Sequence, residues 1–296
     1  MKTITFIINP ISGTTHKNYI PQLINEIINS SLFQIEVIYT EYAGHAHALA
    51  KQKAQDKVDI VVAVGGDGTV NEVASALVHT TTSLAIVPCG SGNGLARHLQ
   101  IPLNIQEAVS LITKGVSRKI DYGKINKKLF FCSCGVGFDA LVSWRFSQAP
   151  RRGFMTYCNI AIKENFNYKP ELYQLKVDNN QTITKRAFVI ACGNSSEYGN
   201  DAYIAPKASI QDGLLDITLI EPITLLDIPV LSYQLFNKTI DENKKTSTFR
   251  CKTLHIERKS KGPIHFDGEP IIAPKELIIE VVPSGLNVIT FDNLSI

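Results

Sequence analysis

The chain has 296 residues, which is enough to bury one large hydrophobic core or two smaller ones. Its formal net charge is +3, from 30 Lys and Arg against 27 Asp and Glu, and this balance is too slight to indicate a nucleic-acid partner. No apolar run approaches the roughly 20 residues of a membrane-spanning helix, and the apolar run after Lys2 is too short for a signal peptide.

The 6 cysteines lack both the spacing of a zinc site and the density of a disulfide scaffold. We therefore expect reduced thiols in a cytoplasmic protein.

The first part of the chain repeats a pattern of strand, polar turn and helix. Such alternation predicts a doubly wound parallel sheet with right-handed crossovers, whose polar turns lie at one edge. Open sheets of this kind bind ligands at that edge. Strands are expected at 3–8, 34–40, 60–64 and 83–87, and helices at 19–28, 45–54, 70–77 and 105–112.

The turn at 65–69 reads Gly-Gly-Asp-Gly-Thr and follows the apolar strand 60–64. Its glycines let the backbone approach a phosphate, and the next helix offers unpaired N–H groups. A carboxylate beside a phosphate repels it unless a cation lies between them or a proton must be removed. Asp67 therefore indicates phosphate chemistry with a divalent cation. The alternative is that Asp67 caps the helix and the glycines only form the turn.

The turn after the fourth strand reads Pro-Cys-Gly-Ser-Gly-Asn-Gly at 88–94. Its spacing does not fit the GxGxxG sequence of a dinucleotide-binding loop. We therefore exclude a Rossmann dehydrogenase.

The second part of the chain changes to short alternating strands separated by loops rich in Gly, Asn, Asp and Pro. This pattern predicts a β-sandwich or an open barrel, interrupted by helices at about 140–165 and 225–237. We place the α/β domain at 1–122, with 288–296 returning to it, and the β-rich domain at 123–287. The active site is expected in the cleft between the domains.

Two Asp-Gly pairs stand out in the β-rich part, at Asp212-Gly213 and Asp267-Gly268. A hairpin turn is the simplest explanation of both. Glu269 follows the second pair, so two carboxylates flank one glycine. A kinase needs one acid to accept a hydroxyl proton while metal ions neutralise the triphosphate.

Five segments in series resemble the soluble diacylglycerol kinase family, which includes bacterial lipid kinases and the sphingosine and ceramide kinases. GGDGT alone is weak support, because NAD kinases and phosphofructokinases have a similar turn. The segments are INPISG at 8–13, GGDGTVNE at 65–72, PCGSGNGLAR at 88–97, APKASIQDGLLD at 205–216 and FDGEP at 266–270.

The resemblance implies an ATP-dependent lipid kinase that transfers the γ-phosphoryl group to the hydroxyl of diacylglycerol, a sphingoid base or ceramide. Mg²⁺ would accompany the nucleotide, and Asp67 would organise the phosphates and this ion. The lipid would be met at the membrane surface by a cytoplasmic protein that binds there transiently. By the same resemblance, the nucleotide-binding residues are Asn9, Pro10, Ser12, Gly13, Thr40, Gly65, Gly66, Asp67, Gly68, Thr69, Val70, Asn71 and Ser91.

The resemblance also implies the catalytic acids and a second metal site. Glu269 matches the proton acceptor of the bacterial members, with Asp267 in the same network, whereas sphingosine kinases assign that role to the acid at Asp67. Asp212 matches a structural magnesium ligand. The other ligands of that ion would be the backbone carbonyls of Ser209 and Leu214.

Two departures leave the acceptor open. GSGNGLAR stands where bacterial diacylglycerol kinases commonly read GTxNDFAR, so Gly94 replaces an acid. Residues 198–201 read Tyr-Gly-Asn-Asp where relatives often carry a run of glycines. The oligomeric state stays open between a monomer and a homodimer.

Two other functions stay open. One is a kinase of a soluble acceptor such as NAD, and the other is a non-catalytic regulator that binds nucleotide or lipid. Retention of Asp67, Asp267 and Glu269 counts against the regulator, because a binding protein needs no base. The histidines do not combine with a third ligand at zinc spacing, so we expect no transition-metal site.

Overall fold

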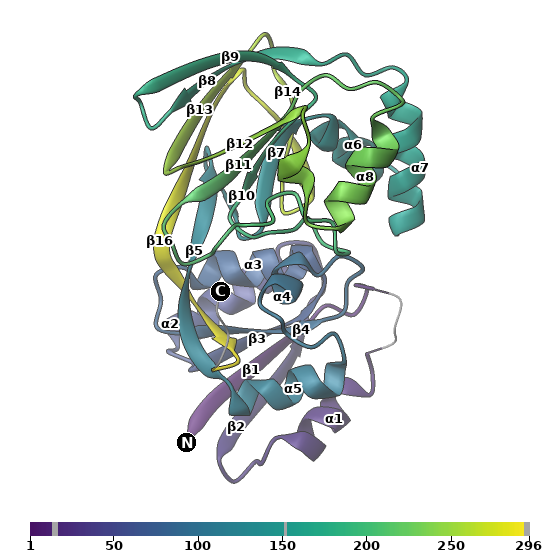
Figure 1. Ribbon diagram of the computed structural model, residues 1–296. Helices are drawn as coiled ribbons and strands as arrows, with labels where there is room; N and C mark the ends of the chain where they lie inside the picture. The colour runs from purple at the N-terminus through teal and green to yellow at the C-terminus, as the bar shows by residue number, and fades with distance from the viewer. Residues whose placement is uncertain (14–16, 151–152, 293–296) are drawn as a thin grey trace. The chain divides into compact units, whose positions relative to one another are not determined.

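The computed structural model describes residues 1–13, 17–150 and 153–292. The chain divides into two compact units, Met1–Asp121 with Pro283–Ile296 and Tyr122–Val282 (Figure 1). The boundary falls within two long strands, β5 (Val116–Ile125) and β16 (Glu276–Thr290). Residues 151–152, in the helix expected at 140–165, and residues 293–296, in the expected C-terminal return, lie outside the described residues.

The first unit contains the predicted parallel sheet, in the strand order β2-β1-β3-β4. Its strands are β1 (Lys2–Ile8), β2 (Phe33–Tyr39), β3 (Ile60–Gly65) and β4 (Ser83–Pro88). β1 pairs in parallel with β2 and β3, and β3 pairs in parallel with β4. The C-terminal part of β16 adds a fifth strand, because Val288 pairs in parallel with Leu84.

Five helices accompany this sheet in the described part of the first unit. They are α1 (Ile20–Ile27), α2 (His45–Gln55), α3 (Asp67–Leu77), α4 (Gly94–His98) and α5 (Ile105–Lys114). α2 contacts α3, and α1 contacts α5. This pairing is what right-handed crossovers require when the strand order reverses at β1, because α1 then lies on the face opposite α2 and α3. β3 and β4 are buried along their whole length, as expected for central parallel strands.

The second unit contains the predicted β-sandwich. One sheet has six strands in the order β12-β11-β10-β7-β14-β15, and every pair is antiparallel. Its strands are β7 (Ser133–Gly137), β10 (Val189–Gly193), β11 (Leu215–Ile220), β12 (Thr246–Cys251), β14 (Gly262–Phe266) and β15 (Glu269–Ala273).

The opposite sheet of this unit continues from β16 in the order β16-β13-β8-β9, while β5 pairs with β16 and β6 pairs with β5. Its further strands are β6 (Lys128–Phe130), β8 (Glu171–Val177), β9 (Gln181–Ala187) and β13 (Thr253–Arg258). Buried side chains of both sheets, such as Ile190 and Leu254, pack together as one core.

Helices cover the outer face of the six-stranded sheet. α6 (Phe138–Ser147), α7 (Phe154–Asn165) and α8 (Ile228–Phe236) gather at one side of this unit in Figure 1, and a short 3₁₀ turn, η1 (Ile240–Glu242), follows α8. Alternate residues of β10 pack in two different hydrophobic cores. Ile190 and Cys192 face the sandwich interior, whereas Val189 and Ala191 pack in a second cluster with Leu231 of α8. Both faces of β10 are therefore buried.

Candidate functional site

Three polar turns lie side by side at the carboxyl edge of the first unit's sheet. Backbone hydrogen bonds continue past the strand ends: Asn9 N–H donates to the carbonyl of Val64 at 3.0 Å, and Cys89 N–H donates to that of Gly65 at 2.7 Å. The turns after β1, β3 and β4 are thereby fixed next to one another.

Glycines let these turns approach backbone to backbone. A Cβ added to Gly13 would lie 1.9 Å from the carbonyl oxygen of Cys89, and one added to Gly90 would lie 2.6 Å from Cα of Gly66. Gly13 also has a φ of 67°, a conformation that favours glycine. No side chain fits at these two positions, so the surface of the turns is backbone.

Asp67 joins two of the turns through its side chain. It is the first residue of α3, yet its carboxylate accepts N–H groups at the start of α4, from Asn93 at 2.9 Å and Gly94 at 2.7 Å. The residue before Asp67 is Gly66, so the first turn of α3 has no side-chain cap. Asp67 therefore caps α4, which neither of our interpretations of this residue had foreseen.

The environment of Asp67 acts on its charge in two directions. Burial raises the pKa of Asp67, while the hydrogen bonds from Asn93 and Gly94 and the charge of Arg97 lower it, with a net increase. Each carboxylate oxygen already accepts one N–H and keeps a second lone pair. The carboxylate can therefore still ligate one cation together with phosphate oxygens, which is the usual way Mg²⁺ is held beside a nucleotide.

The other predicted nucleotide-binding residues lie around these turns. Asn9 donates from Nδ2 to Oγ1 of Thr69 at 3.0 Å, which links the first turn to α3. Thr40 N–H donates to the carbonyl of Ile8 at 2.9 Å, so Thr40 follows β2 at the same edge. Ser91 is exposed, whereas Val70 is 7% exposed and packs in the core. A contact from Val70 to a nucleotide would have to come from its backbone.

Lys17 is a cation of this region that the sequence analysis missed. Its side chain is 3% exposed, and its ammonium donates to the carbonyl oxygen of Ser12 in the first turn. Burial lowers the pKa of Lys17, and the nearby Cys89 acts in the opposite direction. The position of Lys17 in the sequence does not indicate that it is buried beside this turn, because isolated lysines are common on protein surfaces.

In the second unit, Asp267 and Gly268 form the two-residue turn between β14 and β15. Their φ values of 47° and 80° are both positive, as in a type I′ hairpin turn, and Phe266 pairs with Glu269 across the hairpin. The simplest explanation of this Asp-Gly pair therefore describes the backbone correctly. It does not describe what the carboxylate of Asp267 does.

The carboxylate of Asp267 accepts three consecutive backbone N–H groups at the start of β7. Oδ2 accepts from Phe131 at 2.8 Å, and Oδ1 accepts from Cys132 at 2.8 Å and Ser133 at 3.1 Å. Asp267 N–H in turn donates to the carbonyl of Ser133 at 2.8 Å. Asp267 thus anchors the hairpin. Glu269 is the first residue of β15 and its side chain is exposed.

The loop of Ser209, Asp212 and Leu214 does not resemble a strong cation site. Oδ1 of Asp212 accepts the N–H of Leu214 at 3.0 Å, and Oδ2 lies 3.6 Å from Nη1 of Arg250. A guanidinium beside the one carboxylate of this set competes with a divalent cation. The metal site at Ser209, Asp212 and Leu214 stays a prediction.

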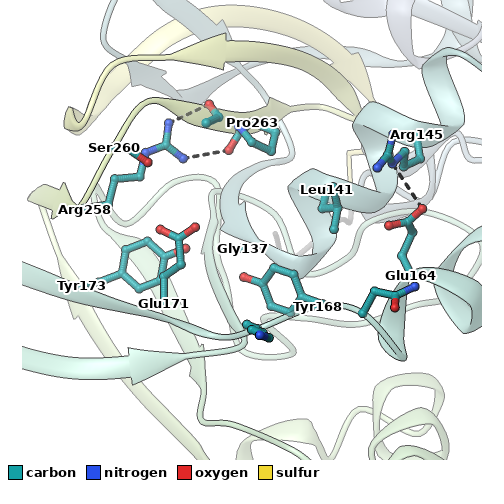
Figure 2. Close-up of a pocket in the computed structure, with 13 residues that line it drawn as sticks. Gly137, Leu141, Arg145, Glu164, Tyr168, Glu171, Tyr173, Arg258, Ser260 and Pro263 are labelled. Atoms are coloured by element: carbon teal, nitrogen blue, oxygen red, sulfur yellow. Dashed lines mark hydrogen bonds and ion pairs between the residues drawn. The ribbon is translucent and has the colours of Figure 1, made fainter.

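A cavity of about 390 Å³ lies in the second unit, away from the predicted site residues, none of which lines it (Figure 2). Arg258 lies over it and gives hydrogen bonds to backbone carbonyls, including those of Gly262 and Pro263 at 2.7 and 2.9 Å. Arg145 and Glu164 form an ion pair of 3.2 Å at another side. Tyr168 lines the cavity and packs against Phe138 and Phe188.

Residues 1–13, 17–150 and 153–292 contain no cluster of three or more His, Cys, Asp or Glu side chains placed to hold a metal ion. Within the same ranges, no helix has the length and apolar character needed to span a bilayer.

Comparison with known protein families matches both parts of the chain. A model of the diacylglycerol kinase catalytic domain matches residues 3–125, and a model of the YegS C-terminal NAD kinase beta sandwich-like domain matches residues 132–290.

Known proteins match along most of their length. A diacylglycerol kinase of Mycobacterium tuberculosis is 29% identical and covers 97% of this chain and 94% of its own. A probable lipid kinase YegS-like of Pectobacterium atrosepticum is 30% identical over 86% of both chains. The crystal structure of a putative diacylglycerol kinase from Bacillus anthracis superimposes with a TM-score of 0.78 at 23% identity, over 98% of both chains, and so shares the fold.

Proposed function

The chain belongs to the family of diacylglycerol kinases and YegS-like lipid kinases, and on this premise we propose that it transfers the γ-phosphoryl group of ATP to a lipid hydroxyl. Diacylglycerol is the first acceptor to test, because it is named for the M. tuberculosis relative. Sphingoid bases and ceramide are the next, because Gly94 stands where bacterial diacylglycerol kinases commonly carry an acid.

The observation that carries this proposal is the backbone surface formed by the three turns of the first unit. A Cβ at Gly13 or Gly90 would fill the space between them, and the first turn of α3 has no side-chain cap for its N–H groups. Such a surface can lie directly against the phosphates of a nucleotide, which receive N–H groups and the positive end of the α3 dipole. The family makes ATP the expected phosphoryl donor.

A magnesium ion, when bound with the nucleotide, would neutralise charge on the triphosphate, and Asp67 is the residue that would hold it. The carboxylate itself keeps the turn before α4 in place through Asn93 and Gly94. In this role Asp67 positions two phosphate-binding turns at once, and positioning is a large part of catalysis of phosphoryl transfer.

Glu269 is the better candidate for the proton acceptor. Both oxygens of Asp67 already accept backbone N–H groups, and those of Asp267 accept three. The side chain of Glu269 is exposed, and no hydrogen bond or ion pair joins its carboxylate to another described residue. Its carboxylate is therefore available to take the proton of the acceptor hydroxyl.

Replacing Glu269 by Gln tests this assignment. We expect kcat for lipid phosphorylation to fall by a factor on the order of 10² to 10⁴, since general base catalysis contributes about that much. ATP binding, measured by calorimetry, should persist. Glu276→Gln is the matched control, because Glu276 is an exposed acid of the same unit, with 70% of its side chain exposed. Unchanged turnover in Glu269→Gln would remove Glu269 from the mechanism.

A further inference from the structure

A buried polar cluster lies in the second unit, beneath the hairpin that carries Glu269. Oδ2 of Asp139 lies 3.0 Å from Nε2 of His265 and accepts the hydroxyl of Tyr198 at 2.9 Å. Asp139 is 7% exposed and His265 is 3% exposed. The three residues are far apart in the sequence, so the fold alone brings them together.

The local sequence makes room for this cluster. A Cβ at Gly135 of β7 would lie 2.6 Å from Oδ2 of Asp139 and 2.8 Å from Nε2 of His265. The ring of Tyr198 packs edge-on against that of His265, with centroids 5.8 Å apart. Burying an acid, an imidazole and a phenol is costly unless they are paired, so the arrangement must be specific.

Asp139 is the polar partner of His265 in this cluster. Because a carboxylate accepts, Nε2 of His265 carries the proton between them. Nδ1 of His265 is buried and has no hydrogen-bond partner among the described residues. The position of the ring therefore depends on Asp139, whose Oδ1 also accepts the N–H of Ala140 at 2.7 Å at the start of α6.

His265 holds the hairpin from the side opposite the sandwich core. It pairs with Pro270 across the hairpin, one step before the pair of Phe266 with Glu269. Ile264 belongs to the sandwich core and Phe266 packs against it, so His265, which alternates with them, faces outward towards α6. Asp267 anchors the turn itself.

Tyr198 connects the cluster to a second loop. Its N–H donates to the carbonyl of Ala202 at 2.9 Å, which closes the loop 198–202. Asn200 and Asp201 in this loop have positive φ values of 53° and 59°. The loop and the hairpin thus share one buried carboxylate.

We propose that Asp139, His265 and Tyr198 are positioning residues that fix the β14–β15 hairpin, and with it Glu269, for proton transfer from the lipid hydroxyl. The effect of the cluster on proton transfer by Glu269 rests on the proposed function. The structural part of the inference, the anchoring of the hairpin by the cluster, can be measured without any substrate.

The test compares four variants of the full chain. His265→Ala and Tyr198→Phe remove a donor to Asp139, and His265→Gln keeps an N–H donor near the position of Nε2. Tyr168→Phe is the matched control, because it removes a phenol hydroxyl of the same unit that lies outside the cluster, where Tyr168 packs between Phe138 and Phe188. Hydrogen exchange of the Asp267 N–H, followed by mass spectrometry of the hairpin peptide, reports on anchoring.

For His265→Ala we expect exchange at the hairpin to accelerate at least tenfold and kcat for lipid to fall by a factor on the order of 10 to 10², since small misplacements of a reacting group have effects of that size. The KM for ATP should stay unchanged. His265→Gln should recover most of both losses, and Tyr198→Phe should show the same effects more weakly. Tyr168→Phe should behave as the wild type.

Two results would overturn the inference: wild-type exchange and kcat in both His265→Ala and Tyr198→Phe, or the same kcat loss in Tyr168→Phe. If His265→Ala does not fold, hydrogen exchange and kcat of Tyr198→Phe and His265→Gln test the inference instead. If the wild type phosphorylates no lipid, the proposed function fails, and the exchange comparison still decides whether the cluster anchors the hairpin.

Discussion

At the scale of single residues, the site depends on side chains whose partners lie far along the chain. The sequence identifies Asp67 from its glycine neighbours, but Asn93, which donates to its carboxylate, lies 26 positions away. The same holds for His265 and Asp139, which are 126 positions apart. Local patterns locate such residues, and only the tertiary fold shows what each one contacts.

Gly13 gives a residue-scale prediction about the backbone surface of the three turns. In Gly13→Ala the new Cβ would meet the Cys89 carbonyl, which cannot move without shifting β4. We expect a loss of about 2–4 kcal/mol in the free energy of unfolding, from overpacking and positive φ together. We also expect weaker ATP binding.

Gly44→Ala is the matched control for Gly13→Ala. Gly44 has a φ of 88° but nothing within 4 Å of an added Cβ, so this variant carries the strain without the collision. Denaturation by urea compares the two. Equal losses in both variants would show that the close approach of the turns contributes nothing.

His98, at the end of α4, gives a prediction of pH dependence. Burial lowers the pKa of His98 to about 4. The unfolded chain, with a histidine pKa of about 6.5, therefore binds a proton between these values that the folded chain does not. The free energy of unfolding should fall as the pH drops from 6.5 to 4, by roughly 2–3 kcal/mol from this group.

His98→Gln should flatten that part of the stability profile, because glutamine does not titrate. His47→Gln in α2 serves as the control for replacing a histidine by glutamine. Urea denaturation at pH 7, 6 and 5 gives the three profiles. A wild-type slope in His98→Gln would contradict the prediction.

At the scale of elements, the hairpin of β14 and β15 combines a backbone turn with a side-chain anchor. Asp267→Ala removes the acceptor of three backbone N–H groups, and we expect it to lower the free energy of unfolding by about 2–4 kcal/mol. Asp267→Asn keeps one acceptor oxygen and tolerates the positive φ, so it should cost less. The fluorescence of Trp144, the single tryptophan, follows unfolding of this unit. A variant Asp267→Ala as stable as the wild type would contradict the anchor.

Most elements of the first unit follow from hydrophobic periodicity, because buried parallel strands and amphipathic helices have distinct patterns. The second unit was harder. β12 (Thr246–Cys251) is mostly polar, and Pro283 interrupts the otherwise apolar run of β16, so hydrophobic alternation alone does not define these strands. The segment 263–271 forms the hairpin of β14 and β15, with its turn at the Asp267-Gly268 pair for which a hairpin turn was the simplest explanation.

At the scale of the whole molecule, the change from alternating strands and helices to short strands predicted two architectures, and the structure confirms an α/β unit and a β-sandwich unit. The five motifs in series indicated the family, and the matches to both family models confirm that family. Periodicity could not supply the hydrogen bonds of Asp67 and Asp267. These bonds show that both acids hold loops in place, and for this reason we propose Glu269 as the proton acceptor.

Transfer of label from [γ-³²P]ATP to an acceptor tests the central claim most directly. The wild-type chain would be offered diacylglycerol, sphingosine and ceramide in mixed micelles, and NAD in solution, each with Mg²⁺. We expect a labelled lipid, with NAD unlabelled, and labelling of the lipid slower by a factor on the order of 10² or more for Glu269→Gln. Label on NAD with none on any lipid, or label on lipid undiminished in Glu269→Gln, would contradict it.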